Sequence, residues 1–113
     1  MVLKTGEKIH VISRRRFPEE VRRHFAGEVK AVSESVIRAE GYVFVFDSGR
    51  NEYLRREDRR NKIVSLADSG NIINVIPKET ALEDLCYELK ENRLVVTDGK
   101  NVALDINEFG AKA

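Results

Sequence analysis

Basic side chains gathered in three places are the residues of this sequence with the clearest chemical potential. Guanidinium groups bind phosphate in a bidentate manner and stack on bases, and Tyr53 offers a ring for base stacking beside the third group. The pattern predicts a nucleic-acid-binding site; the alternative is a solvated surface paired with nearby carboxylates. The groups comprise Arg14, Arg15 and Arg16, then Arg22 and Arg23, and finally Arg55, Arg56, Arg59, Arg60 and Lys62.

Sequence motifs for catalysis or metal binding are missing. His10 and His24 are not spaced as zinc ligands, and no Cys-x-x-Cys or His-Glu-x-x-His pattern occurs. No glycine-rich phosphate loop and no Gly-x-Ser-x-Gly motif is present. The single cysteine, Cys86, falls on an apolar helical stripe and is expected to act as a small hydrophobe. We therefore expect a protein that is not an enzyme and needs no cofactor or metal.

Charge is unevenly distributed along the 113 residues, although the formal net charge is only +1. Residues 1–65 contain 15 Lys/Arg and 10 Asp/Glu, a net +5, whereas residues 66–113 contain 5 and 9, a net −4. Such asymmetry is typical of a basic binding surface beside an acidic one, or of head-to-tail contact between copies. A second hypothesis is therefore a protein-interaction or assembly module that forms a homo-oligomer.

The length favours a single domain over residues 1–113. No apolar run approaches the roughly 20 residues needed to cross a bilayer, and the N-terminus lacks the apolar region of a secretory signal. One cysteine permits no internal disulfide, which indicates a reducing compartment. We expect a cytoplasmic protein with no membrane partner.

Alternating polar and apolar residues predict a mainly β fold, with strands at 8–13, 25–46 (turning at 33–35), 52–56, 62–67 and 71–76. Within 36–46 the residue character of one face changes from polar to aromatic, with Gly41 at the junction. This change predicts a long strand that bends there. Residues 18–23 form either a helical turn begun by Pro18 or a polar loop.

One amphipathic helix and one hairpin are predicted after residue 77. Thr80 and Glu83 fit a capping box, and a helical stripe of apolar residues comes next, so a helix is predicted over residues 80–91. Segments 93–97 and 101–106 flank Asp98-Gly99, a hairpin signal, and residues 107–113 are expected to form a loose tail. The predicted fold class is α+β: a small antiparallel barrel or sandwich over 8–77, then helix and hairpin over 78–106. The helical stripe consists of Leu82, Leu85, Cys86 and Leu89.

Two segments resemble the Sm-like (LSm) family of small β-barrels: the run from Gly27-Glu28-Val29 to Phe44-Val45-Phe46-Asp47, and the segment SGNIINVI at 69–76. In that family a strand opening with glycine feeds a long bent strand, and a Gly-Asn-type loop precedes a final apolar strand. The resemblance covers about residues 8–77 and implies a bent five-stranded barrel that assembles into rings and binds single-stranded RNA. Of the family's loop positions, Gly70 and Asn71 correspond, and the resemblance implies that they contact RNA.

Overall fold

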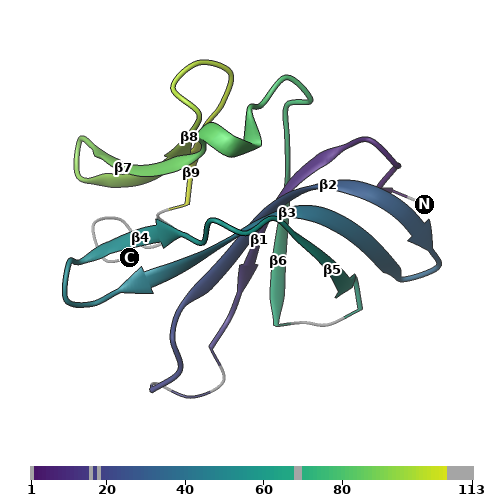
Figure 1. Ribbon diagram of the computed structural model, residues 1–113, viewed down its shortest axis with the longest axis horizontal. Coiled ribbons are helices and arrows are strands. Elements are labelled where there is room, and N and C mark those ends of the chain that lie inside the picture. The colour runs from purple at the N-terminus through teal and green to yellow at the C-terminus, as the bar shows by residue number, and fades with distance from the viewer. Residues whose placement is uncertain (1, 16, 18, 68–69, 107–113) are drawn as a thin grey trace.

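The computed structural model describes residues 2–15, 17, 19–67 and 70–106, which fold into two antiparallel sheets (Figure 1). The mainly β prediction is therefore confirmed. The large sheet contains β1 (Lys8–Ser13), β2 (Arg23–Ser33), β3 (Val36–Asp47), β4 (Glu52–Arg55), β5 (Arg60–Ser65) and β6 (Asn71–Ile76). A short 3-10 turn, η1 (Leu82–Asp84), leads to the small sheet of β7 (Cys86–Lys90), β8 (Arg93–Thr97) and β9 (Ala103–Asp105).

The long strand β3 organises the large sheet, whose order is β4-β3-β2-β1-β6 with β5 also paired to β3. β3 pairs with β5 up to Gly41 and with β4 from Phe44 onward, so it changes partner at the position where the sequence predicts a bend. Gly41 lies opposite Gly27 of β2. A Cβ on Gly41 would collide with the Ala26 carbonyl oxygen, so the strands approach as closely as only glycine allows.

Each face of the large sheet carries its own core, because side chains alternate between faces along every strand. The inner face bears Ile9, Val11, Phe25 and Val43, which pack with Val64 of β5. The outer face is covered at one end by the small sheet (Figure 1). The core between the two sheets contains Ala26, Phe44, Ile76, Leu82, Leu85 and Val96.

The predicted barrel does not close in the described part of the chain. β6 forms one edge of the large sheet, β4 and β5 form the other, and these edges do not pair. The inner face of β5 carries Arg60 and Lys62, in register with Gly41 and Ala39 of β3. Closing the sheet around these two side chains would bury their charges at high cost.

The helix predicted over residues 80–91 is wrong. Only η1 is helical there, the hydroxyl of Thr80 makes no capping hydrogen bond, and the segment from Cys86 onward is strand β7. β7 pairs with β8 through a two-residue turn in which Glu91 and Asn92 have φ of 52° and 65°. These values match a type I′ hairpin turn, so pairing with a neighbouring strand outweighs the local helical pattern.

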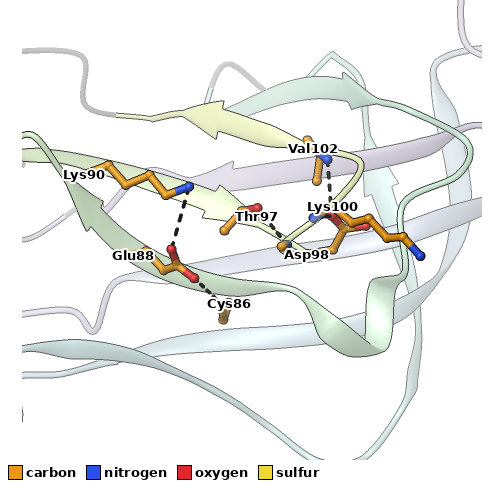
Figure 2. A network of polar contacts seen from close by, with 8 residues as sticks. Cys86, Glu88, Lys90, Thr97, Asp98, Lys100 and Val102 are labelled. Atoms are coloured by element: carbon orange, nitrogen blue, oxygen red, sulfur yellow. Dashed lines mark hydrogen bonds and ion pairs between the residues drawn. The ribbon is translucent and has the colours of Figure 1, made fainter.

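The predicted closing hairpin is present as β8 and β9, but its loop is longer than a two-residue Asp98-Gly99 turn. Thr97 pairs with Ala103, which leaves residues 98–102 in the loop. The Asp98 carboxylate accepts backbone N–H groups of Lys100, Asn101 and Val102, and Figure 2 shows its position inside the loop. A side chain thus sets the loop conformation.

Two other predictions fall partly outside the described residues. Pro18 and the tail at 107–113 are among the residues not described. Residues 19–22 contain no helix, so the polar-loop alternative holds for these residues, and Arg23 already belongs to β2. Among the described residues, no helix has the length and apolar character needed to span a membrane.

Candidate nucleic-acid interface

The predicted basic residues do not converge on one surface, because Arg22, just before β2, and Arg23, the first residue of β2, lie on opposite faces of the large sheet. Arg23 shares the inner face with Phe25, whereas Arg22 lies over the Phe46 ring on the outer face, 5.6 Å from its centroid. The described basic residues therefore divide into an inner group and two outer groups. Arg16 lies outside the described residues.

The inner group consists of Arg23, Arg60 and Lys62, here called the inner cationic cluster. The Lys62 ammonium lies 5.7 Å from the centroid of the buried Phe25 ring, so its aliphatic stem rests on the edge of the inner core. Arg60 forms an ion pair with Asp58, with 2.7 Å between Nε and Oδ2. In the described part of the chain, neither Arg23 nor Lys62 forms an ion pair.

Electrostatics within this cluster disfavour the charged form of Lys62. Partial burial lowers the pKa of its ammonium, and the positive charges of Arg23 and Arg60 lower that pKa further. A lysine held close to two arginines and lacking a carboxylate partner is poised to bind an anion. This is the feature that distinguishes the cluster from an ordinary solvated surface.

The two loop positions that resemble the Sm-like family, Gly70 and Asn71, lie at the end of the large sheet where Arg23 begins β2. Asn71 pairs in register with Ser13, which in turn pairs with Arg23. The Gly70 carbonyl accepts the backbone N–H of Arg14 at 2.7 Å, which extends the β1–β6 ladder. The fold therefore places Asn71 in the sheet row of Arg23 and Gly70 one position beyond it, whereas Arg60 and Lys62 lie farther along the sheet, opposite Gly41 and Ala39.

The first outer group consists of Arg15 and Arg22, which lie near Tyr53. Tyr53 itself is half-buried. The rings of His24 and Tyr87 stack on Tyr53 at 4.6 and 4.4 Å, and these two rings are only 5.5 Å apart. Rings on opposite faces of Tyr53 would be much farther apart, so both lie on one side of it. Arg22 and Arg15 are close enough to lower the Tyr53 pKa, which burial raises. Tyr53 is thus mainly a packing residue between the sheets.

The second outer group is engaged in structural contacts. The guanidinium groups of Arg55 and Arg59 lie over the Tyr42 ring at 4.8 and 5.3 Å, and Arg59 also pairs with Glu40 at 3.4 Å. Arg55 donates to the Glu83 carbonyl near the small sheet. Arg56 is exposed, and its backbone N–H pairs with β3. The ion pair with Glu40 supports the salt-bridge alternative for Arg59, whereas Arg55 is engaged by its cation–π contact and its hydrogen bond.

Cys86 does not behave as predicted from the helical stripe. It is exposed on β7, where its sulfur lies 3.6 Å from the Glu88 carboxylate (Figure 2). Partial burial and this carboxylate raise the pKa of the thiol, which disfavours a nucleophilic thiolate. Among the described residues, no group of three His, Cys, Asp or Glu side chains is placed to hold a metal ion.

Two arrangements in the structure were not predicted from the sequence. Alternation along β2 indicates that Arg23 and Phe25 share a face, but only the pairing of β5 with β3 brings Lys62 to the Phe25 ring. The second is a contact between His10, His24 and Tyr87, which come from three strands. No sequence spacing signals that contact, because it depends on how the sheets pack. No family model, curated protein or solved structure matches this chain.

Proposed function

We propose that this protein binds single-stranded RNA, with the inner cationic cluster of Arg23, Arg60 and Lys62 contacting the phosphate backbone. The observation that carries the proposal is the placement of Lys62, half-buried on the Phe25 ring, close to two arginines and without a carboxylate partner among the described residues. The Sm-like resemblance adds Asn71, which lies in the same sheet row as Arg23, and Gly70 next to it.

Phosphate binding relieves an unfavourable arrangement of like charges. In the free protein the Lys62 ammonium loses hydration and is repelled by Arg23 and Arg60. A phosphodiester oxygen close to the three cations would offset part of their mutual repulsion and raise the Lys62 pKa toward its ordinary value. Arginine forks add bidentate hydrogen bonds to the same group. Stacking of a base on Tyr53 stays a prediction, limited to the ring side turned away from His24 and Tyr87.

The test is fluorescence anisotropy of a short labelled single-stranded RNA at several salt concentrations. If about three cations contact phosphates, a plot of log K against log salt should have a slope of about −2. Lys62→Met keeps the stem on Phe25 and removes the charge, so it should weaken binding and make the slope shallower by about 0.7. Lys30→Met is the matched control, because Lys30 is a strand lysine already paired with Glu28 at 3.2 Å.

If Lys62→Met and Lys30→Met lose RNA affinity equally, binding depends on net charge alone. The inner cationic cluster would then not be the binding site. Heparin serves as a polyanion without bases. Equal affinity for heparin and RNA would identify a general polyanion site. No RNA binding at low salt would contradict the proposal.

A second candidate function is assembly through the edges of the large sheet. Two large apolar side chains on the edge strands are exposed, Ile63 of β5 by 67% and Val75 of β6 by 56%. β6 also contains no charged residue along residues 71–76. Natural edge strands usually carry charges or prolines that block pairing with another chain. This uncharged edge favours a partner strand, and sedimentation of variants with a charge on either edge tests it.

A further inference from the structure

Three side chains form a buried polar contact where the two sheets meet. The Tyr87 hydroxyl of β7 lies 2.8 Å from His10 Nε2 of β1 and 2.6 Å from His24 Nδ1 of β2. His10 is 0% exposed and His24 6%. This contact, named the His–Tyr latch, joins the small sheet to the large one at the centre of their aromatic packing.

The hydrogen bonding of the latch requires that at least one of the two histidines is neutral. A phenol has one proton, so Tyr87 donates to one histidine nitrogen and accepts an N–H from the other. Protonating the acceptor histidine would turn its lone pair into a second N–H donor facing the hydroxyl. Tyr87 would then accept from both rings, and its own O–H would lose its acceptor in a buried site. His10 Nδ1 already has no hydrogen-bond partner.

The surroundings of the latch also oppose a positive charge. Just before β2, the guanidinium of Arg22 lies close to His24; on β1, the Lys8 ammonium donates to the Thr80 carbonyl at 2.6 Å. The other titratable groups facing the pair are Tyr87 of β7 and Tyr53 of β4. In the described residues, neither histidine forms an ion pair with a carboxylate. A proton on either ring would therefore be buried without a counter-charge.

We propose that the His–Tyr latch is an acid-sensitive device that releases the small sheet from the outer face while the large sheet stays folded. The large sheet can persist alone because its inner core is formed by residues between Leu3 and Ile73 and does not depend on β7–β9. The contacts between the sheets, by contrast, centre on the outer face of the large sheet and on Tyr87.

Proton linkage gives the expected change of the release equilibrium constant with pH. Burial lowers the pKa of His10 to about 3 and that of His24 to about 4, whereas in the released state both return toward 6.5. Both histidine pKa values are depressed in the docked state, so the docked state is fully favoured above pH 6.5 and loses stability as the pH falls toward 4. In this window each histidine raises the release equilibrium constant about tenfold per pH unit, so the pair gives about 100-fold.

The test is hydrogen exchange of the full chain, with protection factors compared between strands at pH 7 and pH 5. We expect the protection of β7–β9 amides to fall by about 1,000-fold, while β2 and β3 amides keep most of theirs. His24→Gln should reduce the response to about tenfold per pH unit. Glu88→Gln removes an exposed titratable group from β7 itself and should leave the response unchanged.

Equal loss of protection in both sheets would show global unfolding and overturn the proposal. A ratio of protection factors between the two sheets that does not change with pH would also overturn the proposal. NMR of the histidine ring protons gives a second readout that needs no variant. In the folded protein at pH 6 to 7 the His10 and His24 signals should not titrate, and titration near pH 6.5 would contradict the buried neutral pair.

Discussion

Among single residues, Gly41 shows how one position sets the shape of the large sheet. Its backbone lies against Gly27 and the Ala26 carbonyl, where any Cβ would collide with main-chain atoms. Gly41→Ala should therefore lower the free energy of unfolding by about 3 kcal/mol, measured by urea denaturation. The backbone cannot move aside without disturbing the β2–β3 ladder.

Gly49→Ala is the matched control for this prediction. Gly49 lies in the exposed turn after β3, and a Cβ there would meet only the Asp47 side chain, at 3.3 Å. We expect a change within about 0.5 kcal/mol in either direction. Similar effects at Gly41 and Gly49 would mean that the close approach of β2 and β3 is not a feature of the folded protein.

Asp98 is a second residue whose side chain determines local structure. Its carboxylate accepts four backbone N–H groups, from Ala81 at 3.0 Å and from Lys100, Asn101 and Val102 at 2.9, 2.7 and 3.2 Å. These hydrogen bonds hold the Asp98 pKa well below its usual range. The carboxylate therefore stabilises the fold above pH 4, and this contribution declines as the pH falls below 4.

Asp98→Ala should lower the melting temperature at pH 7 more than Asp98→Asn, because asparagine keeps one acceptor oxygen. The difference between Asp98→Ala and wild type should narrow below pH 4 in thermal melts followed by circular dichroism. Asp84→Ala removes an exposed carboxylate of η1 and should have a smaller effect. An Asp98→Ala difference that widens on acidification would contradict this assignment.

At the level of elements, the sequence predicts the strands of the large sheet better than it predicts the segment after β6. Strands β1 and β6 match their predicted bounds, and the bend at Gly41 is indicated by residue alternation. Segment 80–91 misleads because Leu82 and Leu85 have helical spacing, yet both fill the core between the sheets from η1 and the residue after it. The positive φ of Glu91 marks the turn between β7 and β8, and the local sequence pattern does not predict it.

A substitution in the turn between β7 and β8 tests whether this segment is strand or helix, because the change in the free energy of unfolding has opposite signs in the two cases. Glu91 adopts φ of 52°, which is unfavourable for glutamate and tolerated by asparagine. Glu91→Asn should therefore raise the free energy of unfolding by about 0.5 kcal/mol in urea denaturation. In a helix the same change would be destabilising, because asparagine is the poorer helix former. Glu88→Asn, at a strand position, should not stabilise.

On the scale of the whole molecule, the candidate site depends on how strands are assembled. The three basic groups are visible in the sequence, but their division between two faces depends on the register of β2, β3 and β5. Of the basic residues that the structure describes, Arg23, Arg60 and Lys62 come together on the inner face, and this cluster lies beside an open edge. Closing the sheet would bury these charges at high cost, and left exposed they make that edge a candidate binding surface.

The free edges give the last prediction. If the edges pair between copies, wild type should sediment as a concentration-dependent oligomer in analytical ultracentrifugation. Val75→Lys places a charge on the uncharged β6 edge and should shift the protein to monomer, as should Ile63→Lys on β5. Leu89→Lys is the control, because Leu89 is 73% exposed but lies on the small sheet. A wild-type monomer at high concentration would exclude edge assembly and leave RNA binding as the remaining proposal. If only Leu89→Lys dissociates the oligomer, the interface is on the small sheet instead.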